Sequence, residues 1–217
     1  MITDLFTKQA VIICGHFGTG KTNIAVNLAL SAASEKKPLY IADLDTVNPY
    51  FRTADNAAAL KDAGVNVLLP QFANTNVDIP SLPPSLPLIF TSGNYSVTDV
   101  GGNEEGATVL RGFAPRYKEI GYAMYYVYNR YRPENADLQS SLNSLFAIRY
   151  ASGLDFAGII NNSNLGAETT ADIVKASVKD AEAFAEAAYL KIIMTAAFEK
   201  NAFPGCTVIR DVTKKLF

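Results

Sequence analysis

Eight residues near the start of the chain have the types and the spacing of a phosphate-binding loop. They match the pattern G-x-x-x-x-G-K-[ST] in full. Glycines let successive backbone N–H groups converge on phosphate oxygens, Lys21 offers a charged donor to the outer phosphates, and Thr22 offers a hydroxyl to Mg²⁺. The predicted nucleotide-binding residues of the loop are Gly15, His16, Gly18, Thr19, Gly20, Lys21 and Thr22.

The segments on both sides of the loop have the patterns that this chemistry needs. Ala10 to Cys14 is an apolar run that predicts a buried strand, with Cys14 as a small core residue. Gly20 to Ser34 has helical spacing of apolar residues, and a helix there presents its positive end to an anion. His16 has two interpretations: its side chain reaches a phosphate or a facing subunit, or the position works only through its backbone.

Acidic residues follow two further predicted strands. Asp43 and Asp45 leave the second strand with their side chains on the same side, at the edge where open α/β sheets bind ligands. One carboxylate could hold a Mg²⁺-bound water and the other could orient an attacking water, or the pair is an ordinary feature of a turn. Asp99 precedes two glycines that allow a close approach to metal and phosphate, although residues 95–98 are more polar than a buried strand should be.

A pair of amides ends another predicted strand. Asn161 and Asn162 carry donors and acceptors that could pair with the edge of a base. The alternative is that they open the turn that continues over residues 163–166.

The rest of the chain alternates short apolar runs with longer amphipathic ones. Such alternation predicts an α/β fold, a three-layer α/β/α domain with a mostly parallel sheet, over residues 1–217. The expected strands are Leu39 to Ala42, Val65 to Leu69, Met124 to Tyr128, Phe156 to Ile160 and Leu190 to Ile193. The expected helices are Thr53 to Ala63, Glu104 to Glu119, Ala136 to Ser152 and Thr169 to Ala187.

One proline-rich stretch breaks this alternation. Pro70 to Tyr95 contains five prolines, which remove backbone donors and prevent regular ladders. We interpret it as an irregular excursion within the domain. It is either a passive surface loop or a lid or partner-contact segment.

Composition excludes several classes of protein. The 49% hydrophobic content supports a packed core, and 19 basic against 21 acidic residues leave no excess charge for binding nucleic acid. Two cysteines and one histidine exclude a disulfide scaffold and a His-rich zinc site. Residues 1–6 lack the features of a signal peptide, and no apolar stretch approaches the roughly 20 residues that span a bilayer. We expect a soluble cytoplasmic protein with no membrane partner.

Taken in order, the segments GHFGTGKT, DLDTVNPYF, DVGG and GIINNSNLG resemble the SIMIBI class of P-loop NTPases. The chain is most similar to the MinD/ParA/CobQ-type nucleotide-binding proteins. The resemblance implies ATP and Mg²⁺ as ligands. It implies that Lys21 contacts phosphate as a catalytic residue, that Asp45 activates water, and that Asn161 or Asn162 reads adenine. The implied metal residues are Thr22, Asp43 and Asp99.

The chain departs from this family at one informative position. MinD and ParA relatives usually carry a signature lysine where this chain has His16, and that lysine reaches across a nucleotide-sandwich dimer. A neutral imidazole lacks the fixed charge that stabilises developing negative charge. Residues 207–217 are also too short and mixed to match the membrane-targeting helix of MinD.

Three functions follow from these observations. The chain is a slow ATPase whose nucleotide state controls a partner protein or a homodimer, a regulator that binds nucleotide without turnover, or a CobQ-like synthetase that transfers phosphoryl to a small acid. The synthetase needs cations near the γ-phosphate, for which Arg52, Arg111 and Arg116 are candidates. Because the chain has no Asn-Lys-x-Asp run, we expect adenine to be preferred over guanine.

Overall fold

The computed structural model describes residues 1–45, 53–69 and 82–212. Within these residues, eight strands form one sheet in which every strand pair is parallel, as the sequence predicted. The strand order is β3-β2-β4-β1-β5-β6-β7-β8. The strands are β1 (Ala10–Cys14), β2 (Leu39–Leu44), β3 (Asn66–Leu68), β4 (Tyr95–Val100), β5 (Tyr122–Tyr128), β6 (Phe156–Asn161), β7 (Ile192–Phe198) and β8 (Thr207–Ile209).

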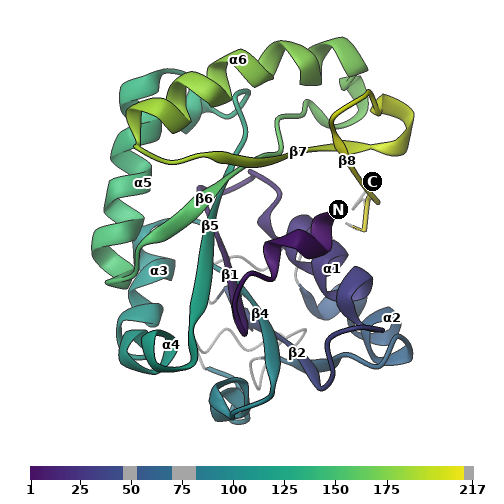
Figure 1. The fold of residues 1–217 in the computed structure, drawn as a ribbon. Helices are drawn as coiled ribbons and strands as arrows, with labels where there is room; N and C mark the ends of the chain where they lie inside the picture. The colour runs from purple at the N-terminus through teal and green to yellow at the C-terminus, as the bar shows by residue number, and fades with distance from the viewer. Residues whose placement is uncertain (46–52, 70–81, 213–217) are drawn as a thin grey trace, which may run out of the picture.

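Helices cover both faces of the sheet and complete a three-layer α/β/α arrangement (Figure 1). The pair α1 and α2 lies on one face, and the other helices lie on the opposite face. The helices are α1 (Lys21–Ala32), α2 (Ala57–Asp62), α3 (Glu104–Arg111), α4 (Ala114–Ile120), α5 (Leu138–Ser152) and α6 (Ala171–Ala187). The predicted fold class is therefore confirmed.

The central strand β1 shows why the apolar runs are continuous. Val11 and Ile13 pack into the core on the α1 side, whereas Ile12 and Cys14 pack into the core on the other side. A strand that is buried on both faces needs apolar side chains at every position. Burial also raises the pKa of the Cys14 thiol, so this cysteine is an inert core residue, as the sequence analysis expected.

Strand β4 is buried despite the polarity of residues 95–98. It lies between β2 and β1, and both Ser96 and Thr98 are buried. The hydroxyls of Thr98 and Tyr117 are 2.9 Å apart and form a buried hydrogen bond. A polar side chain is tolerated in a core when a partner from another element satisfies it, and here α4 provides that partner.

Several helix and strand boundaries differ from the expected ones. The helix expected over Glu104 to Glu119 is two helices, α3 and α4, with Pro115 in the first turn of α4. The region Thr53 to Ala63 begins with a 3₁₀ turn over Thr53–Asn56 before α2 starts. Strand β7 begins after Leu190, whose backbone N–H donates to the Ala185 carbonyl at 2.9 Å, and it runs on to Phe198.

Part of the predicted proline-rich excursion packs into the core. Residues 70–81 lie outside the described residues, but a 3₁₀ turn over Leu86–Phe90 buries Leu86 and Ile89. The Phe90 ring stacks on Phe113, with ring centroids 5.6 Å apart. The interpretation of Pro70 to Tyr95 as a passive loop is therefore wrong for its second half, because that half covers the sheet beside α4.

The segment after β8 is attached to α1 by two buried amide side chains. Asn27 Nδ2 donates to the Arg210 carbonyl at 2.8 Å, and the Arg210 N–H donates to Asn27 Oδ1 at 2.8 Å. One helical turn earlier, Asn23 Oδ1 accepts from the Val212 N–H at 3.0 Å. We call Asn23 and Asn27 the amide latch. It holds the end of the described chain beside the phosphate-binding loop.

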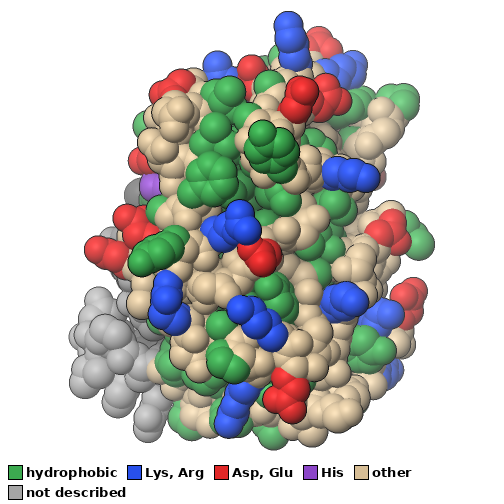
Figure 2. All heavy atoms as spheres, turned by 60° about the vertical axis from the view of Figure 1, so that its left-hand side comes forward, with side chains coloured by type: hydrophobic (Ala, Val, Ile, Leu, Met, Phe, Trp, Pro, Cys, Tyr) green, Lys and Arg blue, Asp and Glu red, His purple; other side chains and the backbone are tan. Residues whose placement is uncertain are grey.

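The surface shows mixed charge on the face that Figure 2 presents. Acidic and basic side chains are interspersed there with hydrophobic ones. On α5, Phe146 and Tyr150 are exposed, and Tyr150 lies under the Arg111 guanidinium at 5.4 Å. Among the described residues, every helix is too short or too polar to cross a lipid bilayer.

We predict that Asn27→Ala lowers the free energy of unfolding by about 1–3 kcal/mol, because both Arg210 backbone groups lose their partners. The matched control is Asn143→Ala on the exposed face of α5, where the amide oxygen accepts from Gln139 Nε2 at 2.9 Å, and the expected change is within about 0.5 kcal/mol. Urea unfolding of both variants measures the difference. Equal stability of the two variants would show that the latch contributes nothing.

Candidate functional site

The predicted phosphate-binding loop connects β1 to α1 at the centre of the sheet. Gly20 caps α1 in the left-handed region, with φ of 88°. A Cβ on Gly20 would lie 2.3 Å from Asn162 Nδ2, so the residue at this position must be glycine for two independent reasons. The start of α1 then points its free N–H groups at the space in front of the loop.

Hydrogen bonds within the loop hold its shape through one carbonyl. The His16 carbonyl accepts from Thr19 Oγ1 at 2.8 Å and from Lys21 Nζ at 3.2 Å. Thr19 is fully buried, and its own carbonyl accepts from Asn162 Nδ2 at 2.8 Å. Asn162, predicted as a nucleotide contact, therefore also braces the loop from the end of β6.

Two of the predicted carboxylates meet at the ends of neighbouring strands. Asp43 and Asp99 are paired in register between β2 and β4, and only 1% and 2% of these residues are exposed. Asp43 Oδ1 accepts from the Asp45 N–H at 3.0 Å, and Asp99 Oδ2 accepts from Thr53 Oγ1 at 3.2 Å. Residues 46–52 of the DLDTVNPYF segment lie outside the described residues.

Burial governs the electrostatics of this cluster. Loss of solvent raises the pKa of Asp99 to about 6, against the opposing effects of a hydrogen bond from Thr22, the charge of Lys21 and a hydrogen bond from Thr53. Burial likewise lowers the pKa of Lys21, whereas Asp99 and Asp45 act in the opposite direction. The cluster therefore holds buried charges that a bound cation and anion would stabilise further.

The same residues fit a hard divalent cation. Mg²⁺ prefers oxygen ligands, and the Thr22 hydroxyl is hydrogen-bonded to the Asp99 carboxylate beside Asp43. Among the described residues, no group of three or more His, Cys, Asp or Glu side chains is placed to bind a metal. A cation here would thus depend on the Thr22 hydroxyl, on phosphate oxygens and on water as well as on carboxylates.

The loop after β4 lies directly against the phosphate-binding loop. A Cβ on Gly102 would be 2.8 Å from backbone atoms of Phe17 and 3.0 Å from Lys21 Nζ. A Cβ on Gly101 would be 3.2 Å from Asp45 Oδ1. Gly102 therefore lets the segment after β4 contact the loop that carries Lys21, and Gly101 leaves room for Asp45, which explains the DVGG segment.

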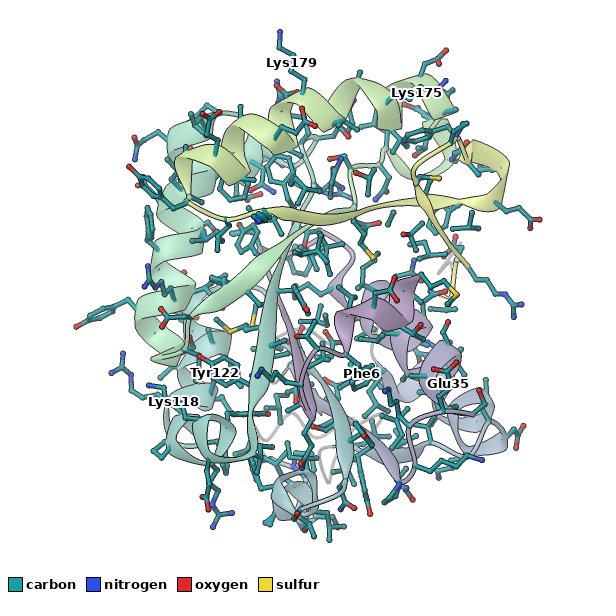
Figure 3. The ribbon with its side chains drawn as sticks, viewed as in Figure 1. Phe6, Glu35, Lys118, Tyr122, Lys175 and Lys179 are labelled. Carbon is teal, nitrogen blue, oxygen red and sulfur yellow. The ribbon has the colours of Figure 1, made fainter. Side chains whose placement is uncertain are left out.

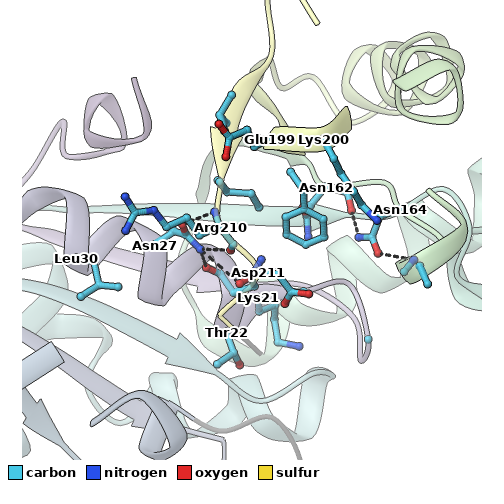
Figure 4. Close-up of a pocket in the computed structure, with 18 of the residues that line it drawn as sticks. Lys21, Thr22, Asn27, Leu30, Asn162, Asn164, Glu199, Lys200, Arg210 and Asp211 are labelled. Atoms are coloured by element: carbon cyan, nitrogen blue, oxygen red, sulfur yellow. Dashed lines mark hydrogen bonds between the residues drawn. The ribbon is translucent and has the colours of Figure 1, made fainter. Parts of the chain in front are cut away.

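A cavity of about 1430 Å³ opens in front of the loop. Lys21 and Thr22 lie at one part of it, and Glu199, Lys200 and Arg210 lie around another part (Figure 4). Asn162 and Asn164 come from the loop after β6. The cavity is long enough to be lined by α1, the end of β6, the end of β7 and β8, so it exceeds what a phosphate alone would need.

Asn161 and Asn162 have different surroundings. Asn161 is fully buried and does not line the cavity. Its amide donates to Ser177 Oγ at 3.0 Å and accepts from the Ser163 backbone and hydroxyl. Asn162 and Asn164 line the cavity instead. Asn164 was not predicted from the sequence, although it belongs to the same GIINNSNLG segment.

His16 is turned away from the cavity. Its Nδ1 lies 3.5 Å from Glu134 Oε2, and the residue is not among those that line the cavity. Gly15 and Thr19 also lie behind the lining residues, where they support the loop. The His16 carbonyl supports the loop, and contact of its side chain with a phosphate or a facing subunit stays a prediction.

Sequence analysis missed a cation that lies against the loop. Arg132, in the segment between β5 and α5, lines the cavity and packs over Gly18. The candidates named from the sequence lie elsewhere: Arg111 donates to the Ala151 carbonyl, and Arg116 lies over the Phe90 ring. Arg52 lies outside the described residues. No signal in the sequence singles out Arg132, because only the fold brings it to the loop.

Comparison with solved structures shows the same fold. FtsY from Thermotoga maritima superposes with a TM-score of 0.54 and 16% identity over 92% of this chain and 69% of its own. FtsY from Mycoplasma mycoides superposes with a TM-score of 0.51 and 16% sequence identity. The match covers 89% of this chain and 61% of that protein. A nucleotide-binding protein from Archaeoglobus fulgidus in complex with ADP superposes with a TM-score of 0.50 and 14% sequence identity. The match covers 89% of this chain and 84% of that protein.

These likenesses show that the chain shares the fold of FtsY and of this nucleotide-binding protein, which agrees with the α/β fold implied by the resemblance to SIMIBI-class P-loop NTPases. The identities are low, so the comparison concerns the fold alone. No family model matches the chain, and no curated protein sequence matches it.

We predict that Gly20→Ala destabilises the protein more than Gly64→Ala. Gly20 and Gly64 have φ of 88° and 86°. Placing an alanine in this left-handed conformation therefore costs the same, about 1–2 kcal/mol, at both positions. The Cβ at position 64 meets open space, whereas the one at position 20 displaces Asn162 from the Thr19 carbonyl. An additional loss of about 1 kcal/mol is therefore expected for Gly20→Ala in urea unfolding. Equal losses would contradict the bracing role of Asn162.

Proposed function

We propose that this protein binds ATP with Mg²⁺ and hydrolyses it slowly as a nucleotide-dependent switch. One observation carries the proposal: Lys21, Thr22 and a buried carboxylate, Asp99, meet where a phosphate-binding loop opens into a cavity of nucleotide size. The structures that share the fold include a protein in complex with ADP, which supports a nucleotide as the ligand.

Each residue has a role that follows from its position. The loop amides and Lys21 would hold phosphates, while Thr22, Asp43 and Asp99 would hold Mg²⁺, which would supply positive charge to stabilise the phosphates. Asp45 lines the cavity beside Gly101, where it can orient a water toward the terminal phosphate. Because little covalent chemistry falls to the protein, catalysis rests on positioning and charge.

Two amide side chains that line the cavity support adenine as the base of the nucleotide. Asn162 and Asn164 bring amides to the cavity, and an amide can both donate to and accept from a base edge. A carboxylate from an Asn-Lys-x-Asp run, which would read the two donors of guanine, is absent from the sequence. A location in the cytoplasm, where ATP and Mg²⁺ are available, fits this ligand.

A second function, nucleotide binding without turnover, is favoured by the orientation of His16. The side chain at the signature position faces Glu134 rather than the cavity, so this position adds no charge to the phosphates. The synthetase receives no support from its described candidate cations, Arg111 and Arg116, which lie away from the loop. In either case we propose that a homodimer or a partner protein reads the nucleotide state.

We predict that Lys21→Ala abolishes binding of ATP with Mg²⁺, because the loop loses its fixed positive charge. Calorimetric titration with ATP and, in parallel, GTP measures both the affinity and the base preference, and ATP is expected to bind more tightly. The control is Lys179→Ala, which removes the same charge from the outer face of α6 (Figure 3). Circular dichroism verifies that both variants are folded. Unchanged affinity in a folded Lys21→Ala would refute the proposed site.

We predict that Asp45→Asn keeps the affinity for a non-hydrolysable ATP analogue within a few-fold but reduces turnover at least tenfold. Asparagine preserves size, yet it loses the charge that polarises water. Asp43→Asn should differ by shifting the Mg²⁺ dependence of binding. Phosphate release and analogue binding are measured on the same preparations. Undiminished turnover in Asp45→Asn would remove this residue from catalysis, and no turnover in the wild type would favour the non-hydrolysing regulator.

A further inference from the structure

The segment between β5 and α5 follows the phosphate-binding loop at two points. Glu134 Oε2 lies 3.5 Å from His16 Nδ1. Two loop residues later, a Cβ on Gly18 would lie 3.4 Å from Arg132 Nε and 3.7 Å from Arg132 Cζ. The guanidinium of Arg132 therefore rests on the loop at Gly18, and both residues line the cavity.

The charge of Arg132 has no protein partner among the described residues. Its Nε is buried, and within residues 1–45, 53–69 and 82–212 it makes no hydrogen bond and no carboxylate lies within ion-pair distance of the guanidinium. Arg130, two residues earlier, shows the usual alternative: its Nε donates to Asp180 Oδ2 at 2.9 Å, and its Nη1 donates to the Ala136 carbonyl. A guanidinium whose buried N–H lacks a partner is an incomplete site for an anion.

The backbone that carries Arg132 is held rigidly by a buried asparagine. Asn129 is fully buried, and its carbonyl accepts from the Arg132 N–H at 3.2 Å and from Asn135 Nδ2 at 3.0 Å. Its Oδ1 accepts from the Tyr131 N–H at 3.1 Å and the Asn164 N–H at 3.2 Å. The network thus holds the turn around Arg132 and joins it to the loop that bears Asn164, so the backbone of Arg132 is positioned beside Gly18 before any ligand arrives.

We propose that Arg132 binds the β- and γ-phosphates of the nucleotide from within the same chain. The inference rests on the proposed function. A guanidinium offers several N–H donors in a planar fork that matches phosphate oxygens. Placed over Gly18 on the same cavity as Lys21, it is a second fixed positive charge for the phosphates. It provides in cis the charge that His16 does not.

The test compares Arg132→Ala with Arg130→Ala, a control that removes the same charge from the same segment but from a side chain paired with Asp180. Both are titrated with a non-hydrolysable ATP analogue and with AMP, each with Mg²⁺. Calorimetry serves the analogue, and NMR titration serves the weaker ligand. Arg132→Ala should bind the analogue about 10- to 100-fold more weakly and AMP within twofold of the wild type. Arg132→Lys should recover part of the loss, and Arg130→Ala should bind both ligands as the wild type does.

Three outcomes would overturn the inference. Analogue affinity within twofold of wild type in Arg132→Ala would show that the guanidinium does not touch phosphate, while the proposed function would stand on the wild-type titration. Equal losses for the analogue and AMP would show that Arg132 shapes the cavity instead. Absence of nucleotide binding by the wild type would remove both the proposed function and this inference. Urea midpoints of the two variants identify any loss that comes from unfolding.

Discussion

Burial of charge at one edge of the sheet is the constraint on which this structure depends. Lys21, Asp43 and Asp99 are each less than a tenth exposed, and ions removed from water are tolerated only when opposite charges and hydrogen bonds surround them. The raised pKa of Asp99 shows that burial outweighs the hydrogen bonds from Thr22 and Thr53. The fold therefore holds an arrangement that a cation and a polyanion would complete.

Parallel topology is what brings these charges together. All strand pairs are parallel, so the carboxyl ends of the strands lie along one edge, and β4 has β2 on one side and β1 on the other. Asp99 is thereby adjacent to Asp43 on β2 and to the start of the phosphate-binding loop after β1. Gly102 then allows a backbone contact with the loop that a larger residue would block.

Patterns within short segments of the sequence predicted the phosphate-binding loop and the buried parallel sheet, because both depend on residue types that are close together in the chain. The order of glycines, Lys21 and Thr22 identified the loop, and continuous apolar runs predicted a sheet covered on both faces. The burial of β4 was not evident, because Thr98 finds its partner, Tyr117, in a helix that follows the strand. The sequence does not tell which of two successive asparagines faces the cavity. In the fold, Asn161 bonds to Ser177, whereas Asn162 lies beside Gly20.

The contacts that escaped sequence analysis join segments that are distant along the chain. Arg132 reaches Gly18, and the amide latch joins α1 to the segment after β8, but no spacing or motif marks these pairs. Their residue types, arginine and asparagine, are also common on surfaces, so only tertiary packing distinguishes them.

Whether one chain or two supply the positive charge around the phosphates affects how nucleotide binding is linked to the pairing of subunits. In a nucleotide sandwich, a lysine from one subunit completes the site of the other, so that binding of phosphate and pairing of subunits are linked. Here His16 faces Glu134, and Arg132 of the same chain lies on the loop. If Arg132 binds phosphate as proposed, Lys21 and Arg132 of one chain would supply positive charge without a lysine from a second subunit. Any partner would then respond to the nucleotide through surfaces whose position the phosphates alter, such as the loop of Gly101 and Gly102 that contacts both Asp45 and Lys21. That loop leads directly into α3, where Gly106 lies against Gly101, and α3 packs against α5. A change at the γ-phosphate would therefore reach the outer face of the molecule through one short, closely packed path.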